Sequence, residues 1–150
     1  MSPIVTTIEI ARPPDEVFAY VTDPSRFVEW QQGVVSGRIE GEGSTRVGSR
    51  CVTTRRIGGS DRTTTSEITE VDPPRRWADH GLDGPIRAKV QVGVEPIDQD
   101  TGSRVTIAVD FEGHGIGKLL VPLFVRPQAR REMPVNCRSL KERLEGRVPT

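Results

Sequence analysis

The chain has 150 residues with 21 Lys or Arg and 21 Asp or Glu, so its formal net charge is zero. This length is typical of one domain with a single core, and the balanced charge disfavours a general nucleic-acid binder, which usually carries a basic excess. Val (18), Thr (13) and Ile (10) far outnumber Leu (6), and β-branched residues favour sheet over a helix bundle. We therefore expect one domain over residues 1–150, rich in β-structure.

The N-terminal part predicts one strand followed by two short helices. Apolar and polar residues alternate in residues 3–11, as in a strand with one buried face. Pro13 and Pro14 then suit the start of a helix, and residues 24–30 carry a second short helical turn with three large apolar side chains.

Turn signals rich in Gly, Pro and Asp divide the middle of the chain into strand segments. There are six of them: 33–43, 46–61, 62–74, 75–85, 86–102 and 103–113. Turns at such short intervals predict an antiparallel meander.

Two stretches within these segments, residues 49–57 and 62–69, are polar on both faces. If the sheet curves around a ligand site, half of these polar side chains point inward and need partners there. The alternative is an exposed end of the sheet, where Thr serves only its β-propensity.

From residue 116 to residue 144 the apolar side chains recur at helical spacing. Pro122, Pro127 and Pro134 are expected to divide this helix into shorter pieces, since a proline inside a helix costs about 3 kcal/mol. Met133 and Cys137 belong to the apolar stripe of the last piece.

Four stretches carry a resemblance to a known family: "IARPPDEVFAYVTDPSRFVEW", "ITEVDPPRRW", "GSRVTIAVDFEG" and "SLKERLEG". The chain resembles the polyketide cyclase/dehydrase-like proteins of the START / Bet v 1 (SRPBCC) superfamily over essentially its whole length. The resemblance implies an α+β helix-grip fold. In this fold a curved antiparallel sheet of about seven strands wraps around a long kinked C-terminal helix, with two short helices after the first strand.

The same resemblance implies a cavity between sheet and helix that binds or carries a small hydrophobic or amphipathic molecule, lipid-like or polyketide-like, with no cofactor. Helix kinks at prolines would let the helix arch over this space, although they could equally follow the curvature of the sheet. We expect the cavity to be lined by Phe27, Trp30, Trp77, Val92, Ile107, Phe111, Phe124, Met133, Asn136 and Cys137.

No catalytic residue is assigned, because the chemical groups are sparse. His80 lies beside Asp79, where general acid–base work is conceivable, but a solvated turn histidine explains it as well. No HExxH or CxxC motif is present, so no metal site is expected. Cys51 and Cys137 are interpreted as free thiols in a reducing cytoplasm. The run "GHGIGK" lacks the first Gly and the final Ser or Thr of a phosphate loop.

Two alternative functions stay open. The first is a cofactor-independent polyketide cyclase or dehydratase, which would be indicated by a perturbed pKa and a partner at a cavity-facing His80, Asp79, Arg50, Arg55 or Glu67. The second is a protein-interaction module that uses the C-terminal helix.

Residues 126–147 of that helix carry seven Lys or Arg against three Asp or Glu. This basic face could contact a membrane surface or an acidic partner, or could simply be solvated. No signal peptide is visible, and the apolar window 116–125 is too short to span a bilayer, so we expect a cytoplasmic chain without a transmembrane segment. The ligand's identity and the oligomeric state stay open.

Overall fold

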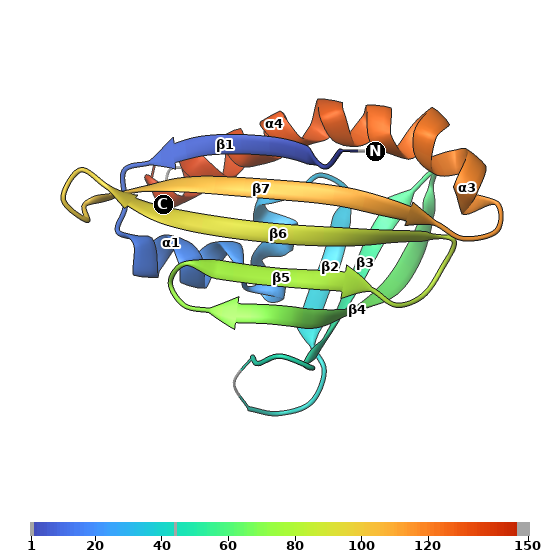
Figure 1. Cartoon of the computed structure of the whole chain (residues 1–150), viewed down its shortest axis with the longest axis horizontal. Helices are drawn as coiled ribbons and strands as arrows, with labels where there is room; N and C mark the ends of the chain where they lie inside the picture. The colour runs from blue at the N-terminus through green and yellow to red at the C-terminus, as the bar shows by residue number, and fades with distance from the viewer. Residues whose placement is uncertain (1, 44, 147–150) are drawn as a thin grey trace.

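The computed structural model of the chain describes residues 2–43 and 45–146. Seven antiparallel strands form one sheet in the order β1-β7-β6-β5-β4-β3-β2, so each strand from β2 onward pairs with its neighbour in sequence and β1 pairs with β7 (Figure 1). The strands are β1 (Ile4–Ile10), β2 (Val34–Ile39), β3 (Arg50–Ile57), β4 (Ser60–Asp72), β5 (Arg76–Gly81), β6 (Ile86–Ile97) and β7 (Gly102–Gly113). The predicted meander is confirmed.

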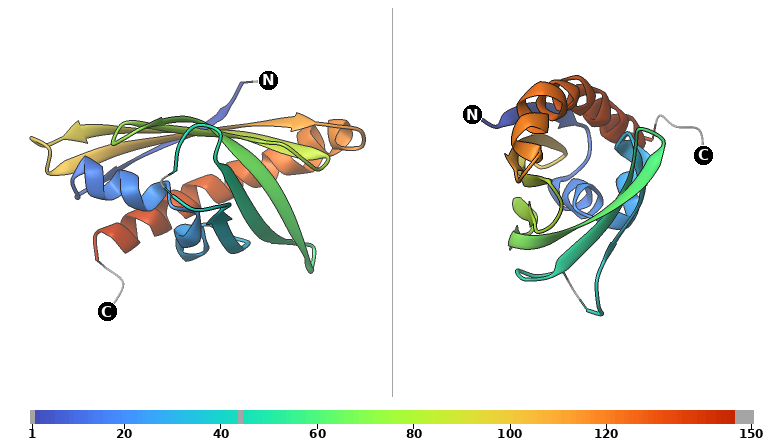
Figure 2. Two further views of the ribbon diagram at one scale, coloured as in Figure 1. Left: turned by 90° about the horizontal axis from the view of Figure 1, so that it is seen from below. Right: turned by 90° about the vertical axis from the view of Figure 1, so that its right-hand side faces the viewer.

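The sheet curls around the helices, as Figure 2 shows in the view along the long axis. The helices are α1 (Pro14–Val21), the 3-10 turn η1 (Pro24–Arg26), α2 (Phe27–Trp30), α3 (Gly117–Leu120), the π-helical turn η2 (Val121–Val125) and α4 (Arg126–Leu144). Together with the curled sheet, the long C-terminal helix makes the helix-grip fold, which confirms the expected fold class.

The prolines of the C-terminal helix do not all divide it, and this part of the prediction was wrong. Pro122 and Pro127 are the second residues of η2 and α4, where the hydrogen-bond pattern changes between α-helical and π-helical. Pro134 lies inside α4, which nevertheless continues as one α-helix to Leu144. The interruption is therefore the π-helical turn η2.

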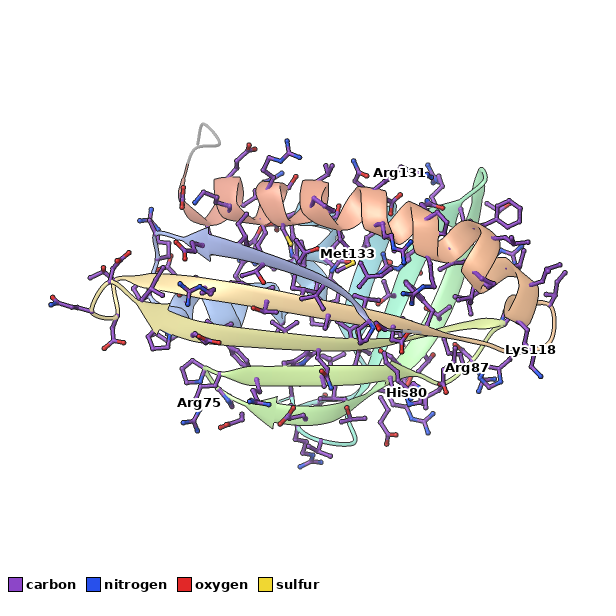
Figure 3. The ribbon with its side chains drawn as sticks, turned by 45° about the horizontal axis from the view of Figure 1, so that its top comes forward. Arg75, His80, Arg87, Lys118, Arg131 and Met133 are labelled. Atoms are coloured by element: carbon purple, nitrogen blue, oxygen red, sulfur yellow. The ribbon has the colours of Figure 1, made fainter. Side chains whose placement is uncertain are left out.

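The core lies between the concave face of the sheet and α4. The stripe of α4 that faces inward consists of Met133, Cys137, Leu140 and Leu144, all buried. Figure 3 shows Met133 directed toward the sheet and Arg131 on the outer side of the helix. The facing strands contribute buried valine and isoleucine side chains, so burial of apolar area holds the helix to the sheet.

Gly117 fixes α3 against the turn between β5 and β6. A Cβ atom at this position would lie 1.8 Å from the carbonyl oxygen of Pro85, which also accepts a hydrogen bond from the backbone N–H of His114 at 2.8 Å. No side chain fits here without a backbone shift, so α3 has a fixed place at the end of the sheet.

We expect Gly117→Ala to lower the free energy of unfolding by about 1 to 2 kcal/mol through overpacking. Gly93→Ala is the matched control, because a Cβ there meets nothing within 4 Å. Urea denaturation of both variants measures the difference. A Gly117→Ala variant as stable as the parent chain would contradict the tight contact.

Candidate ligand-binding site

The structure places the ten predicted cavity residues in three environments. Seven are buried in one core cluster: Phe27, Trp30, Trp77, Val92, Ile107, Met133 and Cys137. Phe111 and Asn136 are half-buried, whereas Phe124 is 63% exposed on η2, outside that cluster. Their contact with a ligand stays a prediction.

An apolar wall runs across three neighbouring strands. Trp77 on β5 is paired with Val92 on β6, which is paired in turn with Ile107 on β7. Paired residues point to the same side of a sheet, and all three side chains are buried, so the wall faces the interior. On the helical side, the rings of Phe27 and Trp30 meet edge to face with centroids 6.0 Å apart.

Asn136 has a structural partner. Its Oδ1 accepts a hydrogen bond of 3.0 Å from the backbone N–H of Gln32. The side chain therefore ties α4 to the segment that follows α2. This contact explains why a polar residue occupies the inner half of the helix.

A polar cluster lies beside the apolar wall, on the inner side of β3, β4 and β5. We define it as Thr53, Arg55, Ser66 and Asp79. Thr53 is buried, and the Ser66 hydroxyl donates a hydrogen bond of 2.9 Å to Asp79 Oδ2. The guanidinium of Arg55 donates one of 3.1 Å to Gln31 Oε1. Of the two explanations for the polar strands, inward-facing side chains hold for these four residues.

Arg55 and Asp79 are among the residues expected to indicate catalysis, but they are not among the predicted cavity-lining residues. The sequence signal that could have placed them there is the alternation of inward and outward side chains along each strand. In "SRCVTTRRI" the side chains of Cys51, Thr53 and Arg55 point inward. Because both faces of the strand are polar, the sequence alone does not show which alternate residues face the interior. Only the pairing of Cys51 with Ser66 and of Ile68 with Asp79 aligns the three strands.

Burial shifts the ionisation of the polar cluster. It raises the pKa of Asp79 to about 6, and the opposing effects of the Ser66 hydrogen bond and of the charges on Arg55 and His80 do not cancel this shift. Burial also lowers the pKa of Arg55, against the attraction of Asp79 and Glu132. A carboxyl that exchanges its proton near neutral pH can act as a general acid or base.

Two buried hydrogen-bond donors have no acceptor. The indole Nε1 atoms of Trp30 and Trp77 make no hydrogen bond among the described residues, and the two side chains are only 7% and 4% exposed. A buried donor left unpaired costs about 1 to 3 kcal/mol. The interior therefore offers two N–H groups that an acceptor on a ligand or a water could satisfy.

The other three residues that were expected to indicate catalysis, His80, Arg50 and Glu67, do not belong to the polar cluster. His80 lies on the outer side of β5, where its Nε2 meets Glu112 Oε1 at 2.5 Å, and this hydrogen bond lowers the pKa of Glu112. Arg50 and Glu67 are paired on the same outer side. Within residues 2–43 and 45–146, no group of three or more His, Cys, Asp or Glu could hold a metal ion.

Two hollows lie elsewhere on the molecule. One, of about 540 Å³, is lined by residues of the β2–β3 connection from Ile39 to Arg50. The other, of about 180 Å³, lies where the end of β1 meets the C-terminal part of α4, between Glu9 and Lys141. Neither borders the polar cluster or the two indole groups.

The comparisons with known proteins agree with this architecture. Residues 1–145 match the family described as "Polyketide cyclase / dehydrase and lipid transport". The chain belongs to this family. No curated protein matches the sequence.

Among solved structures, this family member is similar to the Zhui aromatase/cyclase from Streptomyces sp. R1128, with a TM-score of 0.79 and 16% identity over 99% of this chain and 96% of that one. It is also similar to a START superfamily protein from Mycobacterium smegmatis (TM-score 0.70, 14% identity, 99% and 97% covered). A third similar structure is the di-domain ARO/CYC BexL from the BE-7585A biosynthetic pathway, with a TM-score of 0.75 and 18% identity. The match covers 97% of this chain but only 47% of BexL. At these identities the likeness establishes the fold alone.

In the part of the chain that the structure describes, no helix is both long enough and apolar enough to cross a bilayer.

Proposed function

We propose that this family member binds a small hydrophobic or amphipathic molecule, lipid-like or polyketide-like, between the inner face of the sheet and α4. The observation that carries the proposal is the pair of buried indole N–H groups of Trp30 and Trp77, which have no acceptor among the described residues and belong to the core cluster. Apolar burial would supply the affinity at about 25 cal/mol per Å² before binding costs are subtracted. Indole groups and the polar cluster would orient the oxygen atoms of the ligand.

The groups that would hold the ligand are buried, so we propose that the ligand enters by displacing side chains or by separating α4 from the sheet. Its affinity is then reduced by the free energy of that opening. The expected ligand has an apolar body with at least one hydrogen-bond acceptor.

Mass spectrometry of the purified protein, first native and then denatured, tests the proposal. We expect an apolar adduct that is lost on denaturation, and we expect Trp77→Phe, which removes one indole donor but keeps a ring, to lower its occupancy several-fold. Val47→Ser is the control, because Val47 is exposed and lies far from the interior. Phe18→Tyr is unsuitable as a control, since it would bury an additional hydroxyl group. A protein that carries no adduct and takes up no added fatty acid or aromatic polyketide would contradict the proposal.

The second candidate function is a cofactor-independent cyclase or dehydratase, and the pKa of Asp79 near 6 favours it specifically. The cluster could fold a reactive chain into one geometry while Asp79 moves a proton. A rate that depends on an ionisation near pH 6 and is lost in Asp79→Asn would support this function. A rate that lacks this ionisation and persists in Asp79→Asn would exclude Asp79 as the acid or base, and no measurable rate would leave only binding.

The third candidate is a protein-interaction module on the outer face of α4, which the basic side chains of that helix favour. We place all three functions in the cytoplasm, because Cys51 and Cys137 are buried free thiols and a reducing compartment keeps thiols unpaired.

A further inference from the structure

Four large apolar side chains are exposed together on α3 and η2 and at the residue before them. Ile116, Leu119, Leu123 and Phe124 are 67%, 61%, 57% and 63% exposed. We call this set the apolar tip. Single exposed apolar residues need no explanation, but a group confined to nine residues marks an interaction site.

The apolar tip cannot turn inward, because the opposite side of the same segment is already packed. Gly117 is buried against Pro85, and Val121 is 3% exposed. Figure 1 shows α3 at one end of the long axis of the molecule, so the tip projects from the end of the sheet. A projecting apolar group can enter a soft surface without a complementary groove.

The segment that carries the apolar tip is basic. Residues 113–131 contain no Asp or Glu but include Lys118, Arg130 and Arg131, all exposed. Figure 3 places Lys118 and Arg87 at the same end of the molecule. Arg126 is buried and bonded to Asp110 at 3.2 Å, so it does not contribute to the surface.

Acids also lie near this segment, and one of them, Glu132, directly follows Arg131 and accepts a hydrogen bond of 2.9 Å from Gln128. Glu112, which precedes the segment, is already paired with His80 and lies 3.8 Å from Lys89. Asp83 accepts a hydrogen bond from the backbone N–H of Thr65. At the opposite end of the long axis, the β6–β7 turn carries the exposed acids Asp98 and Asp100 (Figure 1). This asymmetry would turn the apolar tip toward an anionic surface.

We propose that the apolar tip docks on a membrane surface that contains anionic lipids. The four side chains enter the boundary between headgroups and acyl chains, and Lys118, Arg130 and Arg131 contact lipid phosphates. A second copy of the chain fits less well, because a two-fold contact through the tip would bring the same cations together. This docking does not require a bound ligand, so it can be tested separately from the proposed function.

Sedimentation of the whole chain with vesicles tests the docking. We compare vesicles of phosphatidylcholine alone with vesicles of phosphatidylcholine and phosphatidylglycerol, at low and high salt. We expect stronger binding to the anionic vesicles and weaker binding in high salt. Lys118→Gln should weaken anionic binding about fivefold, since one cation near such a surface contributes about 1 kcal/mol.

The double variant Leu119→Ser/Leu123→Ser should weaken binding at least about tenfold, because it removes two inserted side chains. Val47→Ser is the matched control, since Val47 is also 63% exposed but lies on the β2–β3 connection, and its binding should equal that of the parent. Unchanged thermal unfolding of each variant confirms that it is folded.

Three results would overturn the docking: no binding to either vesicle, equal binding by the double variant and the parent, or equal binding to neutral and anionic vesicles. A tip that binds an acidic protein but no vesicle would assign this surface to a protein partner instead.

Discussion

Replacing Asp79 with Asn should raise the free energy of unfolding at pH 7 by about 3 kcal/mol. The pKa of Asp79 is about 6 in the folded chain against its ordinary 3.8, and each unit of difference corresponds to about 1.4 kcal/mol. At pH 7 the folded state must hold this carboxylate ionised beneath the helix, whereas an amide of the same shape carries no charge.

The sign of the pH dependence follows from the raised pKa. Below about pH 4 Asp79 is protonated in both states, and the preference of the folded chain for the protonated form is fully present. As the pH rises from about 4 through 6, the unfolded chain releases this proton first, so the stability of the parent chain falls. Asp79→Asn should lack this fall, and the two chains should converge in acid.

Urea denaturation at a series of pH values measures both effects. Asp100→Asn is the matched control, because Asp100 lies exposed on the β6–β7 turn, at a distance from the polar cluster. Equal slopes for the parent and Asp79→Asn would show that this carboxyl is solvated rather than buried.

The cost of keeping Asp79 bears on function. A buried carboxyl beside Arg55 and Ser66 that destabilises the fold at neutral pH is typical of a site retained for binding or proton transfer. If Asp79→Asn gains stability and loses ligand occupancy together, both effects arise from one residue of the proposed site.

The architecture was predictable because its signals are local. The connections after β2, β3, β4, β5 and β6 are marked in the sequence by Gly, Pro or Asp, and the period-two pattern of β6 and β7 fixes the inner face of each strand. The stripe of Met133, Cys137, Leu140 and Leu144 similarly fixed the inner face of α4.

The site was less predictable because it depends on alignment between strands. Strand β4 shifts register between Ile68 and Glu70, and a shift of one residue exchanges the inner and outer faces. No local pattern in "RTTTSEIT" shows that Ser66 would meet Asp79. The exposure of Phe124 was missed for a related reason, since a π-helical turn displaces side chains from the period of an α-helix.

Replacing Pro134 with Ala should stabilise the chain by about 2 kcal/mol. Pro134 is exposed and lies inside α4, where it provides no N–H for the carbonyl of Arg130 and costs about 3 kcal/mol. Loss of proline's rigidity in the unfolded chain offsets up to about 1 kcal/mol of the gain. Chemical denaturation measures the remainder.

Pro14→Ala is the control for this prediction. Pro14 is the first residue of α1 and follows the extended residue Pro13, so no helical hydrogen bond is lost there, and its replacement should give no gain and a loss of about 0.5 kcal/mol through the unfolded chain. Equal effects at the two positions would mean that α4 already accommodates Pro134 without strain.

A stability cost at an exposed position also suggests why α4 contains this proline. If a ligand enters by separating α4 from the sheet, a weakened helix lowers the free energy of that opening, and Pro134→Ala should raise it by up to the same 2 kcal/mol, about 30-fold in the open population. Exchange of a bound adduct for an added one, followed by native mass spectrometry, should then be slower in Pro134→Ala than in Pro14→Ala. Faster or equal exchange would show that the ligand enters by another route, such as the end of the sheet beside the apolar tip.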